Sequence, residues 1–163
     1  MGYDAHRLVP GRDLVLGGVT IPHPLGLLGH SDADVLAHAL MDAIVGAMRQ
    51  GDIGRLFPDD DAQWAGARST DMLARVAEMM GTQGWRLIDA DCVLVLEEPR
   101  VAPYRDRMRA RLAESMGVDV DAVGVKATTT EGMGFTGERE GVAAYAVVLL
   151  ERVVDTGDAG RES

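Results

Sequence analysis

Two histidines and an aspartate carry the side chains best suited to hold a metal ion. Asp4 and His6 are two positions apart in GYDAH, a spacing that puts both side chains on one face of a strand. His38 follows in GHSDADVLAHALMDAI, which has the apolar pattern of a helix. One carboxylate and two imidazoles can hold zinc and leave its fourth position open for substrate or water. Spacing alone leaves a metal site and a chance pairing equally open.

The helix around His38 has a polar stripe on an otherwise apolar surface. Asp34, His38 and Asp42 are four residues apart and therefore lie along one side of it. A polar stripe on a buried helix needs partners. One interpretation is a capping box of Ser31 and Asp34, with His38 as a hydrogen-bonded core histidine. The other makes His38 a metal ligand and the two aspartates supporting polar groups.

The segment KATTTEGMGFTG, residues 126–137, has the composition of an anion site. Threonine hydroxyls and turn N–H groups can donate to phosphate oxygens, and the carboxylate of Glu131 suits Mg²⁺. Strand propensity and turn formation explain the same residues without a ligand. The segment contains G-x-G-x-x-G, but strand-like sequence follows it, so we reject a dinucleotide site.

Two further loops have both a functional and a structural interpretation. GDIGRLFPDDD, residues 51–61, reads by itself as a solvated acidic loop. EEPRVAP, residues 97–103, joins a strand to a helix. Arg100 and the free N–H groups at that helix start could contact a phosphate. The alternative for Arg100 is an ordinary surface arginine, and both interpretations stay open.

The elements that must position these residues alternate without a strict βαβ repeat. Strand patterns cover residues 2–8, 13–22, 85–98, 122–130 and 141–153, and helical patterns cover residues 32–50, 69–80 and 103–116. This mixture predicts an α+β fold, a single domain with a mixed sheet and helices packed on it. The domain is expected to span residues 1–153, and the polar residues 154–163 are expected to be a disordered tail.

Composition narrows the class of protein further. The 163 residues carry a net charge of −10, which argues against nucleic-acid binding but allows an anionic ligand that metal ions hold. Cys92 is the single cysteine, so no intrachain disulfide can form. No apolar run has the length of a membrane span, and the first residues lack a signal-peptide core. We expect a soluble cytoplasmic protein without membrane contact.

Four segments, in their order along the chain, resemble the 2-C-methyl-D-erythritol 2,4-cyclodiphosphate synthase family of the non-mevalonate isoprenoid pathway. They are GYDAH, LLGHSDADVLAHALMDA, GDIGRLFPD and VKATTTEGMGFTG, and the resemblance extends over about residues 2–152. It implies a homotrimer around a hydrophobic central cavity, with active sites at subunit interfaces. It also implies a phosphorus–oxygen lyase that converts 4-diphosphocytidyl-2-C-methyl-D-erythritol 2-phosphate to 2-C-methyl-D-erythritol 2,4-cyclodiphosphate and CMP.

The resemblance also implies roles for individual residues. Asp4, His6 and His38 match zinc ligands. Glu131 matches a ligand of a second divalent ion, Mg²⁺ or Mn²⁺. The residues expected to contact phosphates, methylerythritol and cytidine, the last from a neighbouring subunit, are Asp4, His6, His30, Ser31, Asp52, Ile53, Gly54, Phe57, Asp59, Asp61, Leu96, Pro99, Arg100, Ala102, Ala127, Thr128, Thr129, Thr130, Glu131 and Phe135.

The implied chemistry is an intramolecular phosphoryl transfer, for which His30 and Thr129 are the predicted catalytic contacts in the transition state. Two rivals use the same residues. A metal-dependent nucleotide phosphohydrolase would activate water in place of the internal phosphate. A trimeric binding module for isoprenoid phosphates would bind without turnover.

Two positions depart from the family pattern. Many relatives have Lys where Arg100 stands, which keeps the charge but changes the hydrogen-bond geometry. Relatives often read GFTGRGEG, whereas this chain reads GFTGEREG, so Glu138 occupies a position associated with a phosphate or isoprenoid diphosphate in the cavity. A carboxylate repels such a ligand, so we do not extend that role to this chain. Phe135, which resembles a cavity-lining phenylalanine, is present.

Overall fold

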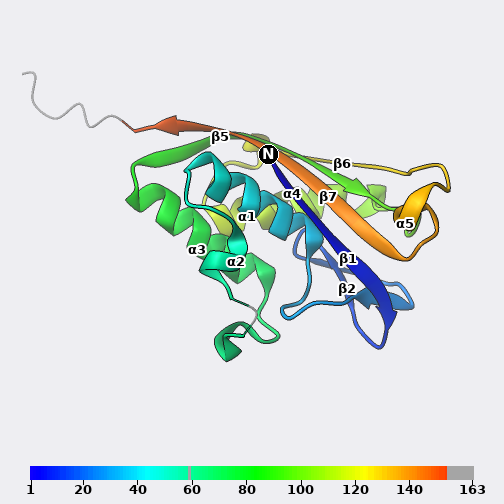
Figure 1. Cartoon of the computed structure of the whole chain (residues 1–163). Helices are drawn as coiled ribbons and strands as arrows, with labels where there is room; N and C mark the ends of the chain where they lie inside the picture. The colour runs from blue at the N-terminus through cyan, green and yellow to red at the C-terminus, as the bar shows by residue number, and fades with distance from the viewer. Residues whose placement is uncertain (59, 154–163) are drawn as a thin grey trace, which may run out of the picture.

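A mixed five-stranded sheet forms one layer of the molecule, and helices form the other (Figure 1). The computed structural model describes residues 1–58 and 60–153, so Asp59 and the expected tail at residues 154–163 lie outside the described residues. The strand order is β4-β1-β7-β5-β6, and of these pairs only β5 and β6 are parallel. The predicted α+β class with a mixed sheet is confirmed.

The elements keep the order expected from the sequence. The sheet strands are β1 (Gly2–Pro10), β4 (Leu25–Leu27), β5 (Trp85–Val95), β6 (Val123–Thr128) and β7 (Gly141–Arg152), and a separate hairpin consists of β2 (Leu14–Leu16) and β3 (Val19–Ile21). The helices are α1 (Val35–Ala47), α2 (Ile53–Leu56), α3 (Ser69–Thr82), α4 (Arg105–Met116) and α5 (Gly134–Gly137). Single 3-10 turns lie at Ala62–Trp64, Ala102–Tyr104 and Val120–Ala122.

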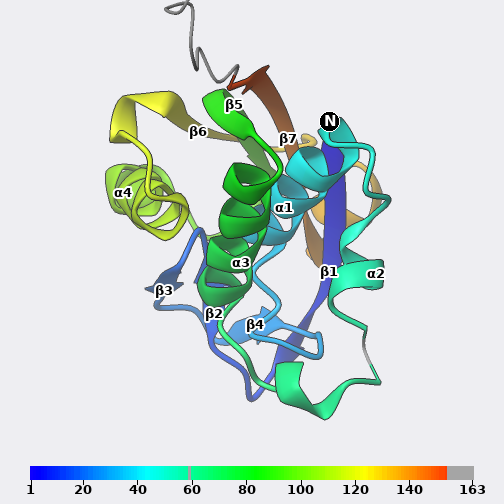
Figure 2. The ribbon, with the colours of Figure 1, turned by 90° about the vertical axis from the view of Figure 1, so that its left-hand side faces the viewer.

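Helices α1, α3 and α4 cover one face of the sheet, and α1 lies directly on β1 and β7 (Figure 2). The alternation of β1 turns Gly2, Asp4 and His6 toward α1, while Tyr3 is exposed on the opposite face. A Cβ atom built on Gly2 would overlap the carbonyl oxygen of Ala39 in α1. Glycine at this position therefore allows the close approach that brings α1 to the ligand-bearing strand.

The start of α1 differs from the prediction. The helix begins at Val35 rather than at residue 32, and Asp34 is its N-cap, accepting hydrogen bonds from the backbone N–H groups of Leu36 and Ala37. The capping box of Ser31 and Asp34 is therefore wrong. The helix also ends earlier, at Ala47, because Arg49 already takes a left-handed conformation with φ of 61°.

The other boundaries move by a few residues. Helix α4 begins at Arg105, because Pro103 lies in the 3-10 turn that precedes it. The G-x-G-x-x-G segment forms only the single helical turn α5 before β7, in agreement with the rejection of a dinucleotide site. None of the helices in the described residues is both long and apolar enough to cross a bilayer.

Candidate metal centre and active site

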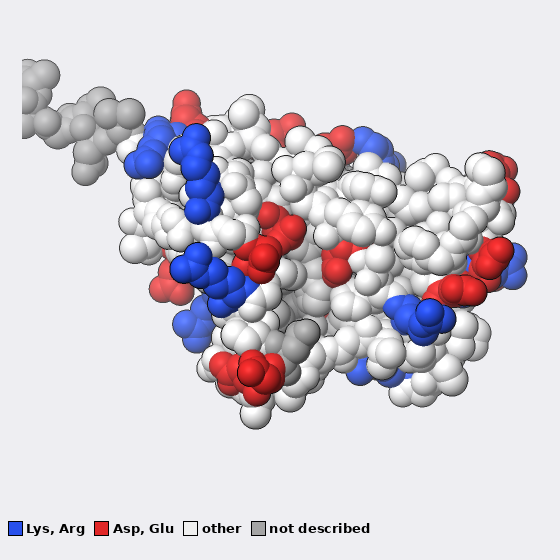
Figure 3. All heavy atoms as spheres, in the orientation of Figure 1, with Lys and Arg blue, Asp and Glu red and all other residues white. Residues whose placement is uncertain are grey.

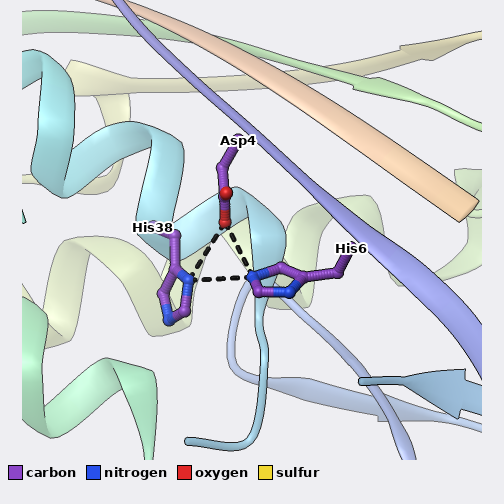
Figure 4. Close-up of side chains that lie close together, drawn as sticks. All are labelled: Asp4, His6 and His38. Atoms are coloured by element: carbon purple, nitrogen blue, oxygen red, sulfur yellow. Dashed lines mark hydrogen bonds and ion pairs between the residues drawn. The ribbon is translucent and has the colours of Figure 1, made fainter. Parts of the chain in front are cut away.

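Asp4, His6 and His38 converge on one point beneath the sheet (Figure 4). The Oδ2 atom of Asp4 lies 2.9 Å from Nε2 of His6 and 3.0 Å from Nδ1 of His38, and the two nitrogens are 3.2 Å apart. Tetrahedral zinc with bonds of about 2.0–2.1 Å separates its ligand atoms by about 3.3 Å. The three atoms therefore already have nearly the spacing that a tetrahedral ion requires, and the metal interpretation of the sequence is favoured over a chance pairing.

The ring of His6 is oriented by a backbone group. Its Nδ1 lies 2.8 Å from the carbonyl oxygen of Leu28, and a carbonyl can only accept a hydrogen bond. The proton of a neutral His6 ring is therefore on Nδ1, and the lone pair of Nε2 points at Asp4 and His38. The N–H of Leu28 donates to the carbonyl of Arg7 at 2.9 Å, which attaches this loop to β1.

Electrostatics couple the three groups. Burial alone would raise the pKa of Asp4, but hydrogen bonds and Coulombic attraction from the His38 and His6 rings in their protonated form hold it well below its usual range. Burial alone would lower the pKa of His6, but its hydrogen bond and Coulombic attraction to Asp4 raise it. The site thus keeps Asp4 ionised and favours a positive charge beside it. This electrostatic environment is suited to a bound cation.

A cavity of about 270 Å³ opens onto this cluster. Five further residues predicted to contact substrate line it, namely His30, Ser31, Ile53, Gly54 and Phe57. Sequence reasoning did not single out Trp64, which also lines the cavity and packs edge-on against Phe57 with ring centroids 4.8 Å apart. The structure therefore brings the cluster of Asp4, His6 and His38 and these five predicted substrate residues into one pocket.

Two other aspartates predicted to contact substrate, Asp52 and Asp61, accept hydrogen bonds from backbone N–H groups. Asp52 is the N-cap of α2 and accepts a hydrogen bond from the N–H of Arg55 at 3.1 Å. Asp61 accepts from the N–H of Gln63 at 3.0 Å, and its carbonyl oxygen lies 3.4 Å from Nε2 of His30. Neither aspartate is among the residues that line the cavity.

The second half of the predicted substrate residues lies elsewhere on the chain. Leu96 is buried in the core, whereas most of the others are exposed around the ends of β5 and β6. Thr129 donates to Glu131 at 3.0 Å, and the N–H of Thr130 donates to Glu97 at 3.0 Å. Besides Asp52 and Asp61, the predicted substrate residues that do not line the metal-centre cavity are Leu96, Pro99, Arg100, Ala102, Ala127, Thr128, Thr129, Thr130, Glu131 and Phe135.

The carboxylates of the two aspartates of the α1 stripe accept hydrogen bonds from backbone N–H groups and not from the side chains of Asp4, His6 or His38. The fully buried carboxylate of Asp34 accepts from the N–H groups of Gly17 and Gly18 at 2.9 and 2.6 Å, in addition to its cap bonds. Burial raises the pKa of Asp34 to about 6, with a further contribution from the charge on Asp32. Asp42 accepts from the N–H of Ile53 at 3.2 Å and so attaches the α2 segment to α1.

Sequence reasoning missed the groups behind His38. The ring of His38 contacts Asp4 and His6 through Nδ1, and Ser31 and Ser69 through Nε2. Ser69 is the first residue of α3, whose N-cap is Arg68. The local sequence holds no signal for a contact between positions that are 31 residues apart.

Comparisons with known proteins agree with this site. The model of the YgbB family matches residues 1–151. A 2-C-methyl-D-erythritol 2,4-cyclodiphosphate synthase of Thermosynechococcus vestitus is 56% identical over 150 residues, which are 92% of this chain and 93% of that protein.

Solved structures with the same fold extend the comparison. A 2C-methyl-D-erythritol-2,4-cyclodiphosphate synthase solved in its CDP-bound form has a TM-score of 0.84 and 41% identity, over 92% of this chain and 97% of that one. The bifunctional IspDF of Campylobacter jejuni has a TM-score of 0.89 and 39% identity, over 93% of this chain and 41% of that longer one. The chain therefore belongs to the YgbB family, together with relatives that are 2-C-methyl-D-erythritol 2,4-cyclodiphosphate synthases.

Proposed function

We propose that the protein is a cytoplasmic phosphorus–oxygen lyase that converts 4-diphosphocytidyl-2-C-methyl-D-erythritol 2-phosphate to 2-C-methyl-D-erythritol 2,4-cyclodiphosphate and CMP. The observation that carries this proposal is the cluster of Asp4, His6 and His38 at the base of the cavity, in a chain of this family. The CDP in a related synthase supports a cytidine nucleotide as part of the substrate.

The donor set fits zinc. Two imidazole nitrogens and one carboxylate oxygen are ligands that zinc accepts, and three protein ligands leave one position for a substrate oxygen. The ring of His6 directs its lone pair inward because its other nitrogen is committed to Leu28. When bound, zinc would offset the repulsion between the substrate phosphates and stabilise charge on the transferred group.

The main task of the protein in this reaction is to hold the flexible anionic substrate in a folded conformation, with its two phosphate groups close together. The 2-phosphate oxygen forms a bond to the β-phosphorus, the bond from that phosphorus to the CMP oxygen breaks, and CMP leaves with the electron pair. Holding both ends together replaces an encounter in solution, for which effective molarities reach about 10⁵–10⁸ M. Ile53, Gly54, Phe57 and His30 line the cavity, and the ring of His30 can donate to a phosphate oxygen.

We further propose a homotrimer around a central cavity. Tyr3, Tyr145, Val147 and Leu149 lie exposed on the sheet face that carries no helix, and the two tyrosine rings are 4.9 Å apart. Exposed apolar side chains grouped on one face are typical of a subunit interface. Assembly through this face would let the cytidine-binding residues of one subunit complete the metal-centre cavity of another, which supports an active site shared between subunits.

Glu131 and Thr129 are among the predicted substrate residues that lie outside the metal-centre cavity. Both are exposed, and they are held together by a hydrogen bond from the threonine hydroxyl to the carboxylate. Carboxylate oxygens are suitable ligands for Mg²⁺ or Mn²⁺. We propose that Glu131 binds this second divalent ion between the phosphates, and that Thr129 contacts the transferred phosphate.

The net charge of −10 favours a small anionic substrate held by metal ions over nucleic acid. On the face shown in Figure 3, Lys and Arg side chains alternate with Asp and Glu and do not merge into one basic surface. Nucleic-acid binding requires such a surface.

The deciding experiment is to incubate the protein with the diphosphocytidyl substrate, Zn²⁺ and Mg²⁺ and to follow the products by ³¹P NMR. CMP together with the cyclic diphosphate would confirm the proposed reaction. CMP with a linear product would identify a phosphohydrolase. Binding of isoprenoid phosphates without turnover would identify a binding module.

A further inference from the structure

We infer that Asp32 and Ser69 are positioning residues that set the tautomer of His38 and thereby turn its Nδ1 lone pair toward Asp4 and His6. The inference rests on the proposed metal centre and deepens it. It concerns Nε2 of His38, the ring nitrogen that does not contact Asp4 and His6. Neither residue touches the proposed substrate cavity, so each would act through His38.

The contacts form a chain from a carboxylate to the ring. The hydroxyl of Ser69 is fully buried and lies 3.0 Å from Nε2 of His38. On its other side it contacts Oδ1 of Asp32 at a very short distance. The backbone N–H of Ser69 also donates to Oδ2 of Asp32 at 3.1 Å, and the N–H of Asp34 donates to Oδ1 at 3.2 Å.

The direction of each bond follows from the chemistry of the groups. An ionised carboxylate has no proton to give, so the single hydroxyl proton of Ser69 must point at Asp32. The oxygen of Ser69 then has only lone pairs left for His38 and must accept from Nε2–H. A neutral ring protonated on Nε2 carries its lone pair on Nδ1, the atom 3.0 Å from Asp4. In metal-free protein the Asp4 carboxylate can itself accept from Nδ1–H, so the bonds to Ser69 and Asp32 oppose the tautomer that Asp4 favours.

Ser31 shows why this direction has to be imposed. Its hydroxyl lies 3.2 Å from Nε2 of His38 and 3.4 Å from the oxygen of Ser69, and it accepts from the N–H of Ala33 at 3.1 Å. Among these contacts the hydroxyl proton of Ser31 has no carboxylate as its acceptor. Without Ser69 that proton can be donated to Nε2, which would stabilise the opposite tautomer, with Nδ1 protonated and unable to bind a metal.

The backbone holds this arrangement in place. The N–H of Asp32 donates to the carbonyl of Ala67 at 3.0 Å, and the N–H of Gly66 donates to the carbonyl of His30 at 2.8 Å. Arg68 makes no side-chain cap bond at the start of α3, so Asp32 supplies the missing acceptor at that terminus. A carboxylate at a helix N-terminus is also favoured by the helix dipole. One side chain therefore both caps α3 and orients a ligand on α1.

Partners of this kind commonly change metal affinity by about 10- to 100-fold when they are removed. The test uses Asp32→Asn, which keeps the shape of the side chain, and Ser69→Ala, which removes the hydroxyl. The matched controls are Asp71→Asn, which removes an exposed carboxylate from the first turn of the same helix, and Ser115→Ala, which removes a hydroxyl bonded only to the α4 backbone at 2.9 Å. Circular dichroism verifies that each variant is folded.

Two measurements are made on each protein. The first is ¹⁵N NMR of the imidazole nitrogens in metal-free protein, at a pH where the rings are neutral, which reports the tautomer directly. The second is the affinity for Co²⁺ by competition with a chromophoric chelator, together with the visible absorption of the Co²⁺ complex. The NMR measurement needs no metal, so it separates the positioning role from the proposed metal centre.

In the unchanged protein and both controls we expect the Nε2-protonated tautomer of His38 to be populated to the same extent, and Co²⁺ affinities within about twofold of one another. In Asp32→Asn and Ser69→Ala we expect a shift toward the Nδ1-protonated tautomer and a loss of Co²⁺ affinity of about 10- to 100-fold. Unchanged tautomer and affinity in both variants would overturn the inference. An unchanged protein with the expected tautomer and no Co²⁺ binding would instead count against the metal centre of the proposed function.

Discussion

Nδ1 of His38 in α1 lies 3.0 Å from Oδ2 of Asp4 in β1, although the two residues are 34 positions apart. This contact joins the helix layer to the sheet at the point where His6 also arrives. Because all three groups come from one chain, the proposed metal centre does not need a neighbouring subunit. The proposed substrate site does need one, and the two requirements can be separated by experiment.

Replacing His38 with Ala should abolish zinc binding and slow cyclisation by about 10²- to 10⁴-fold, since a metal contributes several kcal/mol of charge stabilisation. Zinc content by mass spectrometry and turnover by ³¹P NMR would measure both effects. The oligomeric state should not change, because His38 lies on the covered side of the sheet. Full activity in the metal-depleted variant would refute the zinc assignment.

Replacing Glu131 with Gln should weaken Mg²⁺ dependence while zinc content stays the same. Glu131 is exposed and is not part of the Asp4, His6 and His38 cluster. Activity measured against Mg²⁺ concentration should show a right-shifted curve, with zinc content determined in parallel. An equal loss of both metals would argue for one shared site.

Replacing Gly2 with Ala should destabilise the fold and the metal centre together. The added methyl would overlap the carbonyl oxygen of Ala39 and force α1 away from β1, separating His38 from its partners. Overpacking of this kind costs about 1–3 kcal/mol. Thermal unfolding and zinc affinity would both fall. Gly46→Ala is the control, because its Cβ would meet no atom within 4 Å and alanine is the better helix former.

Replacing Val147 with Asp should dissociate the proposed trimer. Val147 is 55% exposed on the apolar sheet face, and a charge there would have to be buried on assembly. Light scattering should report monomers that retain zinc but have lost cyclisation. Glu151→Gln, near the end of the same strand, is the control. A monomeric parent protein would contradict the trimer itself.

The stability of metal-free protein should depend on pH in a defined way. The lowered pKa of Asp4 contributes stability that is present above its unfolded value of about 3.9 and is lost as pH falls. The raised pKa of His6 contributes stability that is present below about pH 6.5 and is lost as pH rises through the folded value. The contribution of this pair should therefore be greatest between about pH 4 and 6.5. Unfolding midpoints measured in chelator for the parent and His6→Ala would check this, and parallel curves would contradict it.

The sequence by itself determined the ligand types and the elements that carry them. D-x-H in a strand places Asp4 and His6 on one face, and the apolar pattern around His38 requires a buried helix, because both rules depend only on local backbone geometry. The order of four motifs also identified the family, which the family model confirms. Boundaries were less accurate, because caps such as Asp34 depend on contacts with distant turns, here the N–H groups of Gly17 and Gly18.

The tertiary structure alone decided which polar groups support the centre. The polar stripe suggested Asp34 and Asp42, yet the groups behind His38 are Ser69 and Asp32, and Ser69 comes from another helix. A hydrogen bond requires its two heavy atoms to lie within about 3 Å of each other. The residue spacing along one helix does not predict which residue of a separate helix comes this close. The contact exists because α3 packs beside α1 with its N-terminus at the level of His38, a relation that arises only when the layers assemble.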